Sequence, residues 1–257
     1  MARSYKNKRS HKTKRCDGGM VFIIAECGVN WRALSEAATL IKNAARCGVD
    51  AVKFQAFTRE QVFSHPAFED YLKDIIMTQG RAKYLASVAR KNRVEFMCTP
   101  MYPEAVDMLD PYVERWKIRY DDRENHKLIN FCQVTGKEIL ISTRNAHTKR
   151  DEKIKLLYCV PEYPPAVIQL PEQFDKFEGF SSHYPDHQVP IMAMRRGAQI
   201  IEVHVKMNKY SDGWVPADDA VSINMLQLGD LVRHARTISR KWRREKRPDQ
   251  TKLRCKK

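Results

Sequence analysis

Long apolar runs are absent from this sequence of 257 residues, although hydrophobic residues make up 43% of it. No stretch approaches the roughly 18–20 apolar residues that a membrane-spanning helix needs. The opening segment, MARSYKNKRSHKTKRC, also lacks the apolar core of a secretory signal. We therefore expect a cytoplasmic protein with no membrane segment. The length suits one large hydrophobic core, near the usual size of a single α/β barrel.

Paired cysteine motifs are missing as well. The seven cysteines stand singly, their number is odd, and no CxxC occurs. This pattern is typical of reduced thiols in the cytoplasm and not of a disulfide framework. No GxGxxG follows the first apolar run, which counts against a dinucleotide-binding fold.

Acidic residues are absent from residues 1–16, which hold seven Lys and Arg, and residues 240–257 hold ten basic residues against two acids. Residues 17–239 contain 29 basic and 29 acidic residues, so the two ends carry the whole net charge of +15. Such ends commonly attract nucleic acid or other polyanions; disordered ends that only aid solubility are the alternative. We expect basic, disordered tails at 1–19 and 240–257 around one domain at 20–239.

Eight short apolar runs recur, at 21–26, 50–55, 94–98, 115–118, 138–142, 155–160, 177–181 and 200–204. Near-continuous apolar runs are typical of strands that are covered on both faces. Helical periodicity follows most of them, at about 34–46, 68–92, 102–110, 124–135, 187–197 and 222–243, whereas 143–154 is too short to predict a helix. The alternation predicts an α/β protein, a single-domain (β/α)₈ TIM barrel, with an open doubly wound sheet as the alternative.

Polar side chains gather at the ends of these runs: Glu26, Lys53, Gln55, Thr99, Lys117, Ser142, Tyr163, Ser181, His183, Glu202 and His204. Because barrel active sites lie at the C-terminal ends of the strands, these residues predict one active site. Lys53 and Lys117 stand in apolar runs, and two lysines that face one cavity favour a phosphate or carboxylate between them. His183 and His204 end adjacent strands and could share a divalent ion, with a structural role as the alternative.

Several segments resemble, in order over about residues 20–235, the motifs of the sialic acid synthase family. They are IAECGVN (24–30), DAVKFQAF (50–57), CTPMYPEAVDML (98–109), WKI (116–118), ILIST (139–143), LLYCVPEYP (156–164) and GFSSHYPDHQVPIMAMRRGAQIIEVHV (179–205). The resemblance implies a barrel that condenses phosphoenolpyruvate with an aldehyde sugar of the N-acetylhexosamine type. The expected product is a nonulosonic (sialic-type) acid, with release of phosphate and with Mn²⁺ or Mg²⁺ as cofactor.

The resemblance also implies roles for single residues. It places phosphoenolpyruvate against Lys53, Thr99, Lys117, Ser142 and Ser181, and the metal at His183 and His204. It assigns Glu26, Glu202 and Asp218 to the sugar or to the surroundings of the metal, and Tyr163 to substrate binding. The catalytic set that it predicts is Asp122, Glu26, Lys53 and Lys117.

The sequence departs from the family pattern after two strands. KIRYDD (117–122) stands for KIGSGE, so Asp122 replaces the catalytic glutamate, and Arg119 and Arg144 replace glycines. The chain ends where the family's C-terminal antifreeze-like domain would begin, and that domain normally lends an arginine to the sugar site. We therefore expect a barrel domain alone, in which one or both of Arg119 and Arg144 replace that arginine and bind an anionic or otherwise altered acceptor. The alternative is that both arginines turn to solvent or pair with Asp121 or Glu124.

Two other functions stay open at this point. One is a catalytically silent barrel that acts as a nucleic-acid-associated or structural protein through its basic tails. The other is an aldolase that forms a Schiff base on one of two facing lysines. The sequence leaves open the acceptor, the metal, and whether the chain forms a homo-oligomer.

Overall fold

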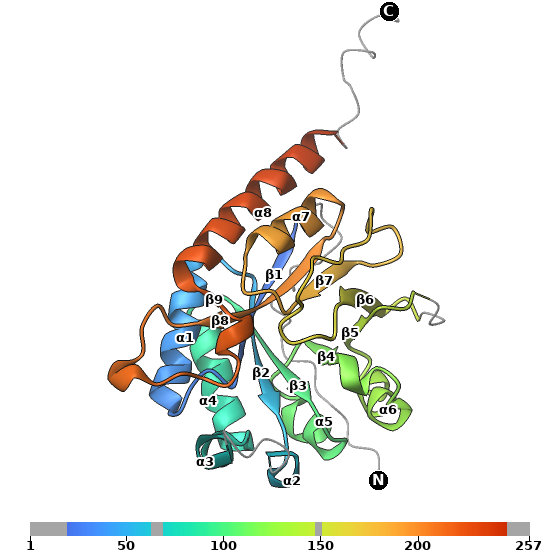
Figure 1. Ribbon diagram of the computed structural model, residues 1–257. Coiled ribbons are helices and arrows are strands. Elements are labelled where there is room, and N and C mark those ends of the chain that lie inside the picture. The colour runs from blue at the N-terminus through green and yellow to red at the C-terminus, as the bar shows by residue number, and fades with distance from the viewer. Residues whose placement is uncertain (1–19, 63–68, 147–150, 246–257) are drawn as a thin grey trace, which may run out of the picture.

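The computed structural model describes residues 20–62, 69–146 and 151–245, which form a nearly closed barrel of eight parallel strands (Figure 1). The strands are β1 (Phe22–Gly28), β2 (Ala51–Ala56), β3 (Glu95–Pro100), β4 (Arg115–Ile118), β5 (Glu138–Thr143), β6 (Ile154–Cys159), β7 (Gly179–Ser182) and β8 (Ile200–Lys206). Hydrogen bonds give the order β3-β2-β1-β8-β7-β6-β5-β4, and β3 packs beside β4 at the remaining seam. The predicted TIM barrel is therefore confirmed.

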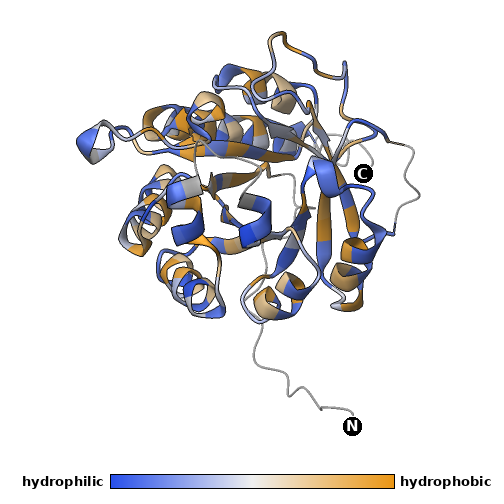
Figure 2. Cartoon of the chain, turned by 60° about the horizontal axis from the view of Figure 1, so that its bottom comes forward, coloured by the Kyte–Doolittle hydropathy of each residue, from blue (hydrophilic) through white to orange (hydrophobic). Residues whose placement is uncertain are grey.

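Helices surround the strands and turn their apolar residues toward them (Figure 2). They are α1 (Leu34–Cys47), α2 (Arg59–Val62), α3 (Glu69–Leu72), α4 (Gln79–Lys91), α5 (Glu104–Leu109), α6 (His126–Val134), α7 (Gln188–Arg195) and α8 (Met225–Glu245). In the described part of the chain, no helix lies between β5 and β6 or between β6 and β7. None of the described helices combines the length and the apolar character that a bilayer crossing requires.

The strands lie within two residues of their predicted bounds, but the single helix predicted at 68–92 is wrong. It divides into α3, the 3₁₀ turn at Lys73–Ile75, and α4, because Ile76 is extended with φ −49° and ψ 129°. The Thr78 side chain then accepts a hydrogen bond from the Arg81 backbone amide and starts a new helix. The periodicity of apolar residues alone cannot predict such a helix cap.

The interior of the barrel changes from apolar to polar along each strand. The part nearer the N-terminal ends of the strands, called the floor below, is a separate apolar cluster of Phe22, Ile24, Ala51, Met97, Leu140, Leu157 and Ile200. Side chains in a strand alternate between its two faces. The residues two positions further along, such as Glu26 on β1 and Glu202 on β8, therefore also point inward. The fold thus places the polar strand ends above a filled apolar floor.

An ion cluster holds the floor together at the N-terminal ends of the strands. Arg115, at the start of β4, donates to Glu95 at the start of β3 over 2.7 Å and to Glu138 at the start of β5. Its guanidinium also lies 4.6 Å from the centre of the Phe22 ring. The side chains of Arg115 and Glu95 are only 5% and 10% exposed, so this pair is largely shielded from water, whereas Glu138 is 26% exposed. The cluster links the two strands that flank the seam of the barrel.

We expect Arg115→Met to lower the free energy of unfolding by about 3 kcal/mol, because Glu95 would remain buried without its cation. Urea unfolding followed by circular dichroism measures the change. Arg233→Met is the matched control, since Arg233 is exposed and its pair with Asp230 lies on the surface. Equal stability of the two variants would contradict a structural role for this cluster.

The long helix α8 is the last element of the described domain. Asn224, in the short strand β9 (Ile223–Asn224), caps it by accepting from the backbone amides of Leu226 and Gln227, each over 3.0 Å. The helix continues through Glu245, so the predicted boundary at residue 239 is corrected. The first six residues of the predicted disordered tail are helical. Residues 1–19 and 246–257, the rest of the predicted tails, lie outside the described residues.

Candidate functional site

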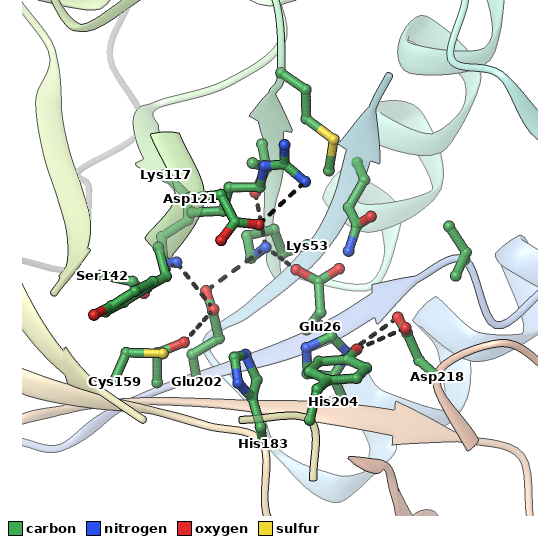
Figure 3. A pocket seen from close by; sticks show the side chains of 18 of the residues that line it. Glu26, Lys53, Lys117, Asp121, Ser142, Cys159, His183, Glu202, His204 and Asp218 are labelled. Atoms are coloured by element: carbon green, nitrogen blue, oxygen red, sulfur yellow. Dashed lines mark hydrogen bonds and ion pairs between the residues drawn. The ribbon is translucent and has the colours of Figure 1, made fainter. Parts of the chain in front are cut away.

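A cavity of about 760 Å³ opens at the C-terminal ends of the barrel strands (Figure 3). Its lining includes twelve of the fourteen predicted site residues: Glu26, Lys53, Thr99, Lys117, Arg119, Ser142, Tyr163, Ser181, His183, Glu202, His204 and Asp218. Asp122 and Arg144 are the two that the lining does not include. Most of the predicted residues thus lie together around one cavity at the strand ends.

Two buried lysines meet two buried carboxylates at the bottom of this cavity. Lys53 Nζ donates to Thr99 Oγ1 over 2.8 Å and forms an ion pair with Glu26. Lys117 Nζ donates to Ser142 Oγ over 2.8 Å and lies 3.2 Å from Glu202 Oε1. Each ammonium group therefore contacts one hydroxyl and at least one carboxylate.

Glu202 lies between the two lysines. Its Oε2 is 3.8 Å from Lys53 Nζ, and its Oε1 also accepts a hydrogen bond from Ser181 over 2.9 Å. Burial works against the charged form of Glu202, but the two ammonium groups outweigh it and hold the pKa of this carboxyl well below its usual range. Burial lowers the pKa of Lys53 to about 8, with Glu202 opposing the shift and Lys117 adding to it. The cluster is an alternating chain of charges shielded from water.

His183 and His204 lie together on the other side of the cavity, with ring centres 5.6 Å apart. His183 Nδ1 contacts the Val160 carbonyl at 3.0 Å, and His204 Nδ1 lies 3.2 Å from Asp218 Oδ2. Tyr163 donates to the second oxygen of Asp218 over 2.6 Å. Burial, with repulsion from His204, lowers the pKa of His183 to about 4, so its ring is neutral at pH 7.

The orientation of the two histidine rings is suited to binding a divalent metal. A metal-binding imidazole normally donates its second ring nitrogen to a carbonyl or carboxylate, as the Nδ1 contacts of His183 and His204 allow. Both Nε2 atoms then remain available as ligands. The described residues contain no group of three or more His, Cys, Asp and Glu side chains arranged to hold a metal. A metal here would therefore take its remaining ligands from substrate or solvent.

Gly28 is required where β1 ends. Its φ of +45° lies in the left-handed region that favours glycine. A Cβ at this position would lie 2.7 Å from Asp218 Oδ2 and 3.3 Å from Glu26 Oε1. The Gly28 amide also donates to Glu26 Oε1 over 2.6 Å. The glycine therefore allows β1 to bring Glu26 close to Asp218.

The predicted position of Asp122 is corrected by the structure. Its Oδ2 accepts a hydrogen bond from Arg119 Nε over 2.6 Å, and the residue does not line the cavity. The 3₁₀ turn at Tyr120–Asp122 turns Asp121 to the cavity instead. Arg119 does line the cavity and also lies 3.7 Å from Asp121, a pairing that was the alternative for this arginine.

The predicted position of Arg144 in the acceptor site is also corrected. Its guanidinium bonds to the side chain of Gln169 and lies 3.8 Å from Glu162. Both partners belong to the segment between β6 and β7, outside the cavity lining. Arg144 therefore holds a loop at this end of the barrel.

Some of the lining residues are not among those predicted from the sequence. Cys159 ends β6 in register with Ser181, and burial raises the pKa of its thiol to about 11. Its place two residues beyond the inward Leu157 could have identified it. An apolar wall of Val29, Phe57, Leu72 and Met101 also lines the cavity. No sequence signal distinguishes these four residues from the core.

Comparison with known proteins agrees with the geometry. The model of the NeuB family matches residues 40–246. N,N'-diacetyllegionaminic acid synthase of Legionella pneumophila is 26% identical over 256 residues, covering 84% of this chain and 71% of the relative. N-acetylneuraminate-9-phosphate synthase of Mus musculus is 24% identical over 255 residues, covering 85% and 70%.

A solved structure shares the architecture. The crystal structure of N-acetylneuraminic acid (sialic acid) synthetase from Leptospira borgpetersenii matches with a TM-score of 0.77 and 26% identity, covering 91% of this chain and 90% of the other. The family model spans most of the barrel, and the motifs that predicted the resemblance lie at the strand ends around the cavity. The chain therefore belongs to the NeuB family, and its relatives include synthases of sialic and legionaminic acids.

Proposed function

We propose that the protein condenses phosphoenolpyruvate with an aldehyde sugar of the N-acetylhexosamine type, forming a nonulosonic acid and releasing phosphate. The arrangement of Lys53 and Lys117 carries this proposal. Two buried ammonium groups, each beside a hydroxyl and a carboxylate, can donate to a small anion that carries a phosphate and a carboxylate. The family membership supports the same chemistry.

In this proposal the lysines bind the anionic groups of phosphoenolpyruvate, together with Thr99, Ser142 and Ser181. Glu26 Oε2 is paired with Lys53, whereas the buried Glu202 Oε2 lies 3.8 Å from Lys53 Nζ and has no hydrogen-bond donor among the described residues. In this proposal Glu202 Oε2 accepts from a substrate hydroxyl or from the attacking water. C3 of phosphoenolpyruvate forms the new bond to the aldehyde carbon. Water adds at C2, and phosphate leaves with cleavage of its C–O bond.

His183 and His204 would hold Mn²⁺ or Mg²⁺, and a bound divalent ion would polarise the aldehyde oxygen as a Lewis acid. Asp218 keeps the His204 ring in position through its contact with Nδ1. Burial works against ionisation of Asp218, but His204 and the hydrogen bond from Tyr163 hold the pKa of this carboxyl below its ordinary value. Asp218 therefore stays an anion at neutral pH.

Glu26, and not Asp122, is our candidate for the general acid and base. Glu26 lines the cavity, is 1% exposed and contacts Lys53, a partner for proton transfer, whereas Asp122 is bound by Arg119 outside the lining. We expect Glu26→Gln to lower turnover by roughly 10²–10⁴. Asp122→Asn should cost less than about tenfold, because it removes only a partly exposed ion pair. Steady-state kinetics on both variants measures the difference, and the reverse order would return the role to Asp122.

The acceptor is tested directly by phosphate release. Purified protein with phosphoenolpyruvate, Mn²⁺ or Mg²⁺ and a panel of aldehyde sugars should release phosphate with only some of them. The panel would include N-acetylated, 6-deoxy and 6-phosphorylated hexosamines. Phosphate release must require both substrates and must match the formation of a nonulosonic acid. Borohydride trapping of a sugar on a lysine, without phosphate release, would instead favour an aldolase. No reaction with any sugar would favour a catalytically silent barrel.

A further inference from the structure

The last turns of α8 extend past the floor of the barrel. The Val21 amide, just before β1, donates to Ser239 Oγ over 2.9 Å, so Ser239 is level with the N-terminal ends of the strands. Residues 240–245 continue the helix away from that level, by about 9 Å at the usual rise per residue. Figure 1 shows these turns of α8 projecting beyond the neighbouring helices, at the top of the view.

The projecting turns are strongly basic. Arg240, Lys241, Arg243 and Arg244 are all exposed. Lys241 lies 3.9 Å from Glu245, and within the described residues the other three have no acidic partner. One or two basic residues in a last turn are the ordinary complement of the helix dipole. Four basic residues within five positions repel one another, and a bound polyanion would relieve this repulsion.

The described chain begins and ends on the same side of the barrel. The described chain begins at residue 20, next to the Val21–Ser239 contact, and α8 leaves the barrel from that contact. Residues 1–16 carry seven basic residues and no acid, and 240–257 carry ten basic residues and two acids. The whole net charge of +15 is therefore attached to the closed end of the barrel. The candidate active site opens at the other end.

We propose that the projecting end of α8 binds the phosphate backbone of nucleic acid without sequence preference. We call Arg240, Lys241, Arg243 and Arg244 the α8 basic surface. Guanidinium and ammonium groups pair well with phosphate oxygens, and their number on this surface sets the strength of the contact. Because the cavity lies at the opposite end, bound nucleic acid leaves it open to substrates.

The packing of α8 favours nucleic acid over a lipid surface. A helix that binds in a membrane interface needs a free apolar face. The apolar face of α8 is instead buried against the barrel by Leu228, Leu231, Val232 and Ala235, and Trp242 packs against the same core. Only the charged side chains of the projecting turns remain available.

The test measures binding of fluorescently labelled duplex DNA to the full chain by anisotropy, from about 50 to 200 mM salt. The variant Arg240→Gln, Lys241→Gln, Arg243→Gln, Arg244→Gln removes the α8 basic surface and keeps good helix formers. The control removes four exposed charges elsewhere, by Lys42→Gln, Lys83→Gln, Lys127→Gln and Lys209→Gln. Phosphoenolpyruvate binding to each protein, by calorimetry, reports on the cavity.

We expect the α8 variant to bind DNA about tenfold or more weakly at low salt, with the slope of log K against log salt reduced by roughly 3 to 4. The control should bind as wild type does, and saturating DNA should leave phosphoenolpyruvate affinity unchanged. Equal loss in the control, no loss in the α8 variant, or competition between DNA and phosphoenolpyruvate would overturn the proposal. So would tighter binding to phosphatidylserine vesicles than to DNA at equal salt. The DNA-binding readouts need neither turnover nor phosphoenolpyruvate binding, so they stand apart from the proposed synthase activity.

Discussion

Lys53→Met and Lys117→Met should each weaken phosphoenolpyruvate binding by about 10- to 150-fold. A hydrogen bond between charged groups contributes about 1.5–3 kcal/mol, which corresponds to that range of affinity. Each lysine is almost fully buried, so water cannot replace the lost ammonium group. Calorimetry with phosphoenolpyruvate and without acceptor measures the change directly.

Lys206→Met is the matched control for these two variants. Lys206 ends β8, is paired with Asp219 over 2.8 Å and lies outside the lining of the cavity. Its removal should leave phosphoenolpyruvate affinity within about twofold of wild type, since a surface pair contributes about 1 kcal/mol or less and does not touch the ligand. Thermal melting of all three variants separates lost binding from lost folding. Unchanged affinity in both cavity variants would refute the assignment of Lys53 and Lys117.

The polar strand ends could be predicted because two simple rules act together. A strand alternates its faces, and a barrel brings all C-terminal strand ends to one rim. Lys53 on β2 and Glu202 on β8 are far apart in sequence, yet both rules place them inside the barrel at the same level. The apolar floor beneath them follows from the same alternation. The strand positions alone are enough to predict this part of the site.

Asp122 and Arg144 could not be placed in the same way because they follow strands. In the turn after β4, one residue of difference decides whether Asp121 or Asp122 faces the cavity. The Arg119 guanidinium then fixes that choice by binding Asp122. The Arg144 guanidinium donates a hydrogen bond to the side chain of Gln169, which lies in a loop without regular secondary structure. Such choices depend on tertiary contacts that motif spacing does not contain.

His183→Ala and His204→Ala should each abolish turnover, and dialysis against a chelator should do the same to the wild-type protein. The rings meet across adjacent strands, and each has its Nδ1 occupied by a fixed carbonyl or carboxylate oxygen. Re-addition of Mn²⁺ or Mg²⁺ should restore the wild-type protein but neither variant. Titration calorimetry of the metal alone gives a readout that does not depend on the reaction.

Two further variants separate a metal site from a merely structural pair of histidines. Asp218→Asn keeps the size of the side chain but weakens its hold on His204, and we expect metal affinity to fall about 10- to 100-fold. His126→Ala removes an exposed histidine on α6 and should change neither metal binding nor turnover. A structural pair would instead lower the melting temperature in His183→Ala and His204→Ala and leave no measurable metal binding in any protein. Full activity in chelator would remove the metal from the proposed mechanism and leave polarisation of the aldehyde to the side chains of the cavity.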